Sequence, residues 1–206
     1  MFFINELIDR YPRLQNTKEN IEKSVSCIAN SYKNGGKLLV CGNGGSAADA
    51  EHIVGELMKN FRKKRKVSVN FLETYRTVNK CEAPAWLQGS LPVVSLVSFS
   101  AFMTAFNNDV NSIGAFGQQV FSLGSKGDVL LAISTSGNSK NVIEAVKIAR
   151  AKGINTIGLT GSNDSLLLKY CDIAIQAPEI ETYKIQEYHL PIYHAICSEL
   201  EDEFFL

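Results

Sequence analysis

Four hydroxyl side chains lie within the short stretch Ser134-Thr-Ser-Gly-Asn-Ser139. A nearly unbroken apolar run precedes it at residues 128–134, and an amphipathic helical pattern follows at residues 139–151. The stretch is therefore predicted to turn from a strand into a helix, where backbone N–H groups, O–H donors and the positive end of a helix dipole coincide. A phosphate held by neutral donors suits such a turn, because the turn contains no Lys or Arg. A simple helix cap is the alternative interpretation.

A second turn of this kind follows the apolar run at residues 37–41. Its sequence is Gly42-Asn-Gly-Gly-Ser46, and a helical pattern begins at Ala47. The glycines would let a ligand approach the backbone, and Ser46 is expected to cap the helix. The turn lacks the Gly-Lys-Ser/Thr ending of a nucleoside triphosphate loop and the full pattern of a dinucleotide loop. Two turns of this type in one sheet favour a phosphorylated ligand over either turn alone.

Three histidines are candidates for chemistry or for the core. His52 and Glu56 are four residues apart on a predicted helix, so they share one face. Seen alone, that pair is more typical of a core histidine beside a solvated carboxylate than of a catalytic pair. His189 lies on the apolar stripe of the last predicted helix and is expected to be buried, whereas Gln186 and His194 lie beside that stripe.

The order of apolar runs and helical patterns predicts the fold. Apolar segments of five to seven residues alternate with helices, which is typical of a doubly wound, mainly parallel α/β sheet of five strands with helices on both faces. Residues 1–206 are expected to form one domain with two leading helices at 1–35 and a long irregular excursion at about 67–92, helical near 73–79. Pro191 is expected to kink or split the last helix, which starts near residue 181.

Composition excludes several classes of protein. The 206 residues carry a formal net charge of zero, which gives no general reason to expect nucleic acid or a membrane surface as partner. No apolar run is long enough to cross a bilayer, and the first residues do not read as a signal peptide. Five cysteines without a CxxC pair are expected to be reduced thiols of a cytoplasmic protein. The basic run at 59–66 is interpreted as a solvated helix end, with a nucleic-acid patch as the less favoured alternative.

Taken together, these motifs resemble the sugar isomerase (SIS) domain, and within it the phosphoheptose isomerases. The resemblance covers nearly the whole chain, including the two leading helices, and it depends on five features: Cys41-Gly-Asn-Gly-Gly-Ser46, His52 with Glu56, Asn108 with Asp109, Ser134 to Ser139, and Gln186 with His194. The hydroxyl turn alone marks the SIS class. The two pairs His52/Glu56 and Gln186/His194 point to the isomerase branch.

The resemblance implies a function and a site. It implies an isomerase that interconverts sedoheptulose 7-phosphate and D-glycero-D-manno-heptose 7-phosphate through an enediol, with Glu56 and His194 as its acid/base residues and without a nucleotide cofactor. It implies a homotetramer with sites at subunit interfaces and, in some members, one zinc ion held by His52, Glu56, Gln186 and His194. The substrate-binding residues that it implies are Asn43, Gly44, Gly45, Ser46, Asn108, Asp109, Ser134, Thr135, Ser136, Ser139 and Gln186.

One further interpretation stays open at this level. Some SIS proteins sense sugar phosphates, and one bacterial relative binds a replication initiator protein. A protein of that kind would not need an intact catalytic set, whereas Glu56, Gln186 and His194 are all present here. The sequence therefore favours the enzyme.

Overall fold

Five parallel strands form one sheet at the centre of the computed structural model, which describes residues 1–205. The strand order is β2-β1-β3-β4-β5, and every neighbouring pair is parallel. This confirms the predicted doubly wound α/β sheet. The strands are short and almost wholly apolar, as parallel strands covered on both faces must be. Their bounds are β1 Leu38–Cys41, β2 Val93–Ser95, β3 Val129–Ile133, β4 Asn155–Thr160 and β5 Ile173–Gln176.

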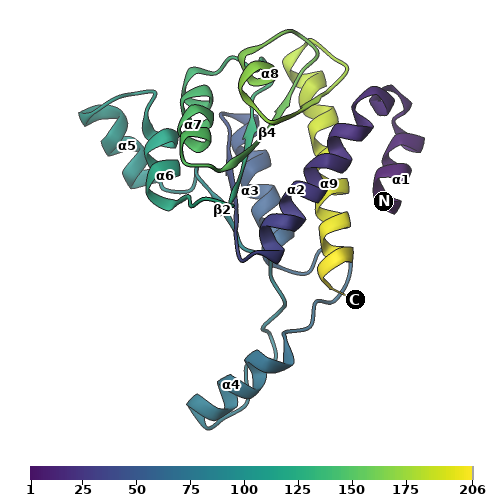
Figure 1. The fold of residues 1–206 in the computed structure, drawn as a ribbon, viewed down its shortest axis with the longest axis vertical. Helices are drawn as coiled ribbons and strands as arrows, with labels where there is room; N and C mark the ends of the chain where they lie inside the picture. The colour runs from purple at the N-terminus through teal and green to yellow at the C-terminus, as the bar shows by residue number, and fades with distance from the viewer. Residues whose placement is uncertain (206) are drawn as a thin grey trace.

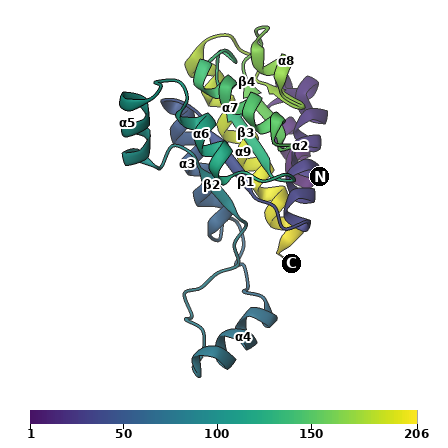
Figure 2. The ribbon, with the colours of Figure 1, turned by 60° about the vertical axis from the view of Figure 1, so that its left-hand side comes forward.

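Helices cover both faces of this sheet (Figures 1 and 2). Alternate residues of each strand point to opposite faces, so Val40 and Leu131 join one apolar cluster while Leu39 and Leu130 join the other. The first cluster contains buried residues of α1, α2, α3 and α9, and the second contains those of α6, α7 and α8. The bounds of these helices are α1 Phe2–Arg10, α2 Lys18–Lys33, α3 Gly45–Met58, α6 Ala115–Leu123, α7 Lys140–Ala151, α8 Leu166–Tyr170 and α9 Thr182–Phe204.

The predicted pair of leading helices is confirmed as α1 and α2. A 3-10 turn, Pro12–Thr17, joins them, because Pro12 has no N–H with which to continue α1. Both helices pack against α9, so the chain's two ends lie on the same face of the sheet (Figure 1).

The excursion at 67–92 carries a helix of its own, α4 (Val69–Asn79), and stands away from the sheet (Figures 1 and 2). The helix begins four residues earlier than the sequence pattern predicts, because the hydroxyl of Ser68 accepts a hydrogen bond from the N–H of Phe71 and caps it. None of the residues of α4 is buried. No regular element lies between α4 and β2.

The last helix is not split at Pro191. α9 is a single element of 23 residues, so that expectation is wrong in this respect. Proline removes one backbone hydrogen bond, but buried Ile192, Ile196 and Leu200 pack into the apolar core beyond it and hold the helix in place. His189 is fully buried on the same helix, as predicted. No helix of the described residues is long and apolar enough to span a membrane.

Candidate active site

The two turns meet at the carboxyl ends of neighbouring strands. β1 leads into the glycine turn and β3 leads into the hydroxyl turn, and the strand order reverses between these two strands. In open α/β sheets this switch point forms the crevice in which ligands bind. A cavity of about 290 Å³ lies there, and the residues that line it come from both turns and from the start of α9: Asn43, Gly44, Gly45, Ser46, Ile133, Ser134, Thr135, Ser139, Thr182 and Gln186.

The hydroxyl turn is held in shape by its own side chains. The hydroxyl oxygens of Ser134 and Ser139 are 2.9 Å apart, and Ser136 lies 3.5 Å from Ser134. Gly137 has φ +64°, a backbone conformation that disfavours side chains, and a Cβ there would come within 2.2 Å of the Ser165 hydroxyl. The turn therefore presents several neutral donors at the start of α7. The described residues that line the cavity include no Lys or Arg, as the sequence led us to expect.

The glycine turn differs from the prediction at Ser46. This residue is buried inside α3, and Gly44, with φ +56°, is the residue that precedes the helix. The side-chain amides of Asn43 and Asn141 exchange two hydrogen bonds of 2.9 and 2.8 Å, which tie the glycine turn to α7. Sequence reasoning missed Asn141, because the two asparagines are 98 residues apart and nothing local pairs them.

A second cluster joins α3 to α9. Nε2 of His52 is 3.2 Å from Oε1 of Glu56, and Nδ1 of His52 is 2.9 Å from the hydroxyl of Tyr193. The hydroxyl of Tyr193 in turn donates to Asp49 over 3.3 Å. The rings of His52 and His194 lie edge to face with their centroids 5.0 Å apart. The fold thus brings His52, Glu56 and His194 together, and it adds Tyr193 and Asp49, which sequence reasoning missed.

Burial sets the acid–base properties of this cluster. Burial lowers the pKa of His194 below its ordinary value, and the neighbouring His52 lowers it further, while Glu56 opposes both effects. His194 is therefore neutral near pH 7, and its Nε2 is buried without a hydrogen-bond partner among the described residues. Burial also raises the pKa values of Asp49 and Tyr193. The carboxylate of Glu56 is almost buried and lies 3.2 Å from Nζ of Lys59 as well as from His52.

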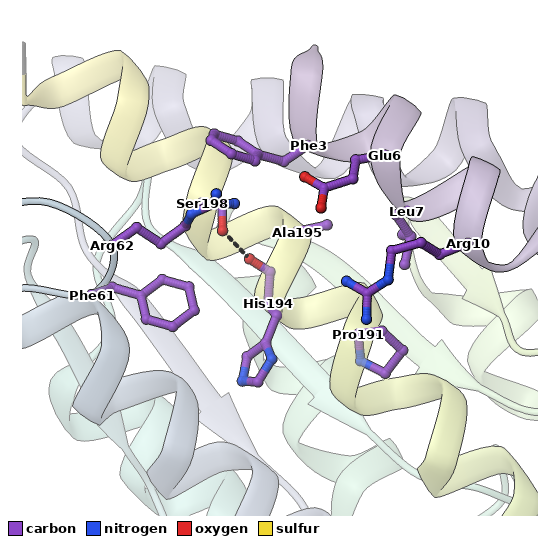
Figure 3. Close-up of a pocket in the computed structure, with 10 residues that line it drawn as sticks. All are labelled: Phe3, Glu6, Leu7, Arg10, Phe61, Arg62, Pro191, His194, Ala195 and Ser198. Carbon is purple, nitrogen blue, oxygen red and sulfur yellow. Dashed lines mark hydrogen bonds between the residues drawn. The ribbon is translucent and has the colours of Figure 1, made fainter.

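His194 also lines a cavity of about 360 Å³ between α1, α9 and the segment that follows α3 (Figure 3). Phe61 packs beside the imidazole, with ring centroids 5.5 Å apart. Arg10 and Arg62 enter the same cavity from opposite sides (Figure 3).

Two of the predicted site residues lie elsewhere. Asn108 and Asp109 end α5 (Ser100–Asp109), and they are exposed and hydrogen-bonded to each other over 2.8 Å. α5 stands on the opposite side of the sheet from α9 and has no buried residue (Figure 1). Neither side chain lines either cavity described above.

The four residues that the resemblance assigns to zinc do not form one assembled set. His52, Glu56 and His194 are neighbours, but Gln186 lies in the other cavity, against Gly45. Within residues 1–205 no group of three or more His, Cys, Asp or Glu side chains is arranged to hold a metal ion. The Nε2 atom of His194 is buried without a hydrogen-bond partner, so this nitrogen is free to bind a metal ion. The arrangement of these residues in a single chain therefore does not form a complete zinc site.

The basic run at 59–66 begins at Lys59, the C-cap of α3, and continues beyond the helix; because Arg65 is buried, the interpretation as a fully solvated run is wrong. Lys59 lies beside Glu56, and Lys63 is 2.5 Å from Asp202. Arg65 is fully buried against Glu201. These three of its six cations therefore have carboxylate partners within the chain.

Comparison with known proteins shows the family to which the chain belongs. A family model described as the SIS domain matches residues 99–198, and a second one of the same description matches residues 3–84. The phosphoheptose isomerase of Aliarcobacter butzleri is 38% identical over 190 residues, which cover 92% of this chain and 88% of the relative. That of Rhodospirillum rubrum is 36% identical over 97% of this chain and 94% of its own.

Solved structures show the same relation. The phosphoheptose isomerase of Neisseria gonorrhoeae superposes with a TM-score of 0.76 at 32% identity, over 96% of this chain and 94% of the other. These matches extend over nearly the full length of each protein, at identities of 32 to 38%. The chain belongs to the phosphoheptose isomerase family, whose members are isomerases built on the SIS domain.

Proposed function

We propose that this isomerase interconverts sedoheptulose 7-phosphate and D-glycero-D-manno-heptose 7-phosphate through an enediol. The observation that supports it is the shared cavity of the two turns, from which α3 and α9 both lead to the acid–base cluster. His52 is six residues beyond Ser46 on α3, or about 9 Å along the helix. A phosphate at one end of an open-chain sugar and reacting carbons at the other would span such a site. The names of the relatives support the same substrate class.

The phosphate would bind at the hydroxyl turn. Ser134, Thr135, Ser136 and Ser139 provide neutral donors at the N-terminus of α7, and Asn43, Gly44, Gly45, Ser46 and Gln186 would face the sugar. Neutral donors suit a substrate that must leave again, because hydrogen bonds from the helix end compensate the charge without a tightly paired cation.

Proton transfer would fall to Glu56 and His194. Glu56 is an almost buried carboxylate and would remove the proton bound to carbon. His194 is neutral, with a free buried nitrogen, and would move the proton on the neighbouring oxygen. Tyr193 would hold the ring of His52 beside Glu56. The shielding of Glu56 and Tyr193 from water would strengthen the interactions that these two groups make.

The only support for zinc is the chemistry of the side chains that the resemblance assigns to it. If zinc binds, His52, Glu56 and His194 would hold it and Gln186 would have to move to it from the other cavity; the bound ion would polarise the substrate carbonyl. Measurement of metal content, followed by turnover with and without a chelator, tests this. We expect proton exchange that depends on Glu56 to persist after chelation, because no step described above uses the metal; complete loss of exchange would show that the ion is needed.

We propose that the protein is a homotetramer with sites at subunit interfaces. The exposed position of Asn108 and Asp109 on α5 supports this, because they could meet a sugar only in the site of another subunit. We also propose that residues 1–206 act as a single SIS domain and that the protein is cytoplasmic. Five free cysteines support a reducing compartment.

The decisive experiment follows the proton on carbon. Sedoheptulose 7-phosphate is incubated with the protein in deuterated buffer, and proton NMR records both product and exchange. We expect Glu56→Gln to abolish exchange while circular dichroism shows an unchanged fold. Asp202→Asn is the matched control, because its carboxylate pairs at the surface with Lys63. Full exchange in Glu56→Gln would remove Glu56 as the base, and binding without turnover by the unaltered protein would refute the enzyme.

A further inference from the structure

A buried ion pair lies directly behind the acid–base cluster. Nε of Arg65 donates to Oε1 of Glu201 over 2.7 Å, and the two side chains are 0% and 1% exposed. The partners are 136 residues apart, one in the segment that follows α3 and the other near the end of α9. Neither belongs to the features through which the sequence resembles its family.

Arg65 holds the end of the helix that carries Glu56. Its Nη2 donates to the carbonyl of Glu56 and its Nη1 to the carbonyl of Leu57, each over 2.7 Å. These are among the last carbonyls of α3, which have no partner within the helix. A cation there also complements the helix dipole. The guanidinium therefore fixes the backbone of Glu56 itself.

Glu201 fixes the chain segment that packs against His194. Besides Arg65, its carboxylate accepts the N–H groups of Phe61 and Arg62 over 3.0 and 2.8 Å. The ring of Phe61 packs beside the imidazole of His194 (Figure 3). His194 and Glu201 are seven residues apart on α9, close to two full turns, so they lie on the same face of the helix.

We propose that Arg65 and Glu201 are positioning residues, which together set the separation between the Glu56 carboxylate and the His194 ring. The inference rests on the proposed roles of those two groups. The ion pair connects the backbone of Glu56 to the helix that carries His194 through five charge-assisted hydrogen bonds and the Phe61 ring. An acid and a base must both reach one substrate, and a misplacement of about 1 Å can cost on the order of 100-fold in rate.

The variants must not leave a lone buried charge. Removing one partner of a buried pair strands the other, so a single neutral variant would report folding more than positioning. Arg65→Met combined with Glu201→Gln is neutral, and the Gln carbonyl can still accept from Phe61 or Arg62. Arg65→Lys keeps the charge but not the planar fork that reaches two carbonyls and the carboxylate. Lys63→Met with Asp202→Asn is the control, since that pair joins the same two segments at the surface.

Steady-state kinetics separate positioning from substrate binding. For the neutral double variant we expect kcat to fall on the order of 100-fold, while KM stays within about threefold because the phosphate turn is untouched. Arg65→Lys should lower kcat in the same direction, and the surface control should change neither constant. A folded double variant that keeps kcat within about twofold would overturn the inference. If the double variant does not fold, Arg65→Lys decides by the same criterion.

A second readout is independent of turnover. The chain has three histidines, and NMR resolves the ring nitrogens of each. In the double variant we expect the resonances of His52 and His194 to shift, while those of the distant, buried His189 stay in place as an internal reference. Unchanged spectra of His52 and His194 would refute the positioning role, whatever the substrate is. The finding that no ketose phosphate is turned over would instead refute the proposed function and leave the NMR test of positioning valid.

Discussion

His189 should make the protein markedly less stable in weak acid. The imidazole is fully buried on α9, where burial lowers its pKa from 6.5 to about 4 despite its contact with the carbonyl of Thr160. The folded protein therefore holds His189 neutral, whereas the unfolded chain takes up a proton below pH 6.5. The contribution of His189 to the free energy of unfolding is fully present above pH 6.5. It is lost as the pH falls toward 4, because the unfolded state then binds a proton that the folded state does not.

The size of the effect follows from the shift. A difference of about 2.5 pH units at 1.36 kcal/mol each corresponds to about 3 kcal/mol of unfolding free energy, of which about 2 kcal/mol is already lost at pH 5. Carboxylates titrate in the same window, so the wild-type curve alone does not isolate this term. The comparison variant is His189→Leu, which leaves no orphaned carbonyl, because Thr160 also accepts the N–H of Ala177.

The assay is urea unfolding at pH 7 and pH 5, followed by far-UV circular dichroism at one protein concentration. Tryptophan fluorescence would report poorly, since Trp86 is exposed on the excursion that stands away from the sheet. We expect wild type to lose about 2 kcal/mol more than His189→Leu between the two pH values. Equal losses in the two proteins would refute the reasoning and would mean that His189 can be protonated without unfolding.

Three further substitutions test the site. Gly137→Ala should cost on the order of 1–2 kcal/mol, because its φ is positive and the new Cβ would collide with Ser165; urea unfolding measures the loss. Ser134→Ala should raise KM about tenfold with little change in kcat, since it removes one hydrogen bond of about 1.5 kcal/mol to the phosphate. Tyr193→Phe should lower kcat about fivefold, the equivalent of one net hydrogen bond of about 1 kcal/mol, because the ring of His52 loses its Nδ1 partner.

Controls separate these effects from general damage. Gly55→Ala is a suitable comparison for Gly137→Ala, since a Cβ at Gly55 meets nothing within 4 Å. A loss of kcat in Ser134→Ala at unchanged KM would contradict a role in phosphate binding. For Tyr193→Phe, an unaltered kcat together with lowered stability would reduce the hydroxyl to a purely structural group.

Local patterns in the sequence were enough to predict most of the fold. Strand–helix alternation fixes a parallel sheet, and a turn that follows a strand of such a sheet must lie at its carboxyl edge. Four-residue spacing on one helix was enough to bring His52 beside Glu56. The apolar stripe of α9 predicted the burial of His189, because residues three and four apart share a helical face.

Local patterns also misled where a distant partner decides the outcome. Arg65 looks like any other cation of a basic run, yet it is fully buried, because its partner lies 136 residues further along the chain. Pro191 breaks an isolated helix, but the core on both sides holds α9 together. Asn108 and Asp109 follow the family pattern, but that pattern gave no sign that α5 places them outside both cavities of a single chain; their role at the site stays a prediction.

The sequence by itself determined the types of chemistry present: a turn rich in hydroxyls that suits a phosphate, a carboxylate and a histidine on one helix face, and the sheet that carries them. These depend on the spacing of neighbouring residues, which helix and strand geometry converts directly into position. Only the tertiary structure decided how the groups meet, through the Asn43–Asn141 amide pair, the contact of Tyr193 with His52, and the buried Arg65–Glu201 pair. Contacts between residues about 100 or more positions apart depend on how whole elements pack, and no local pattern encodes them.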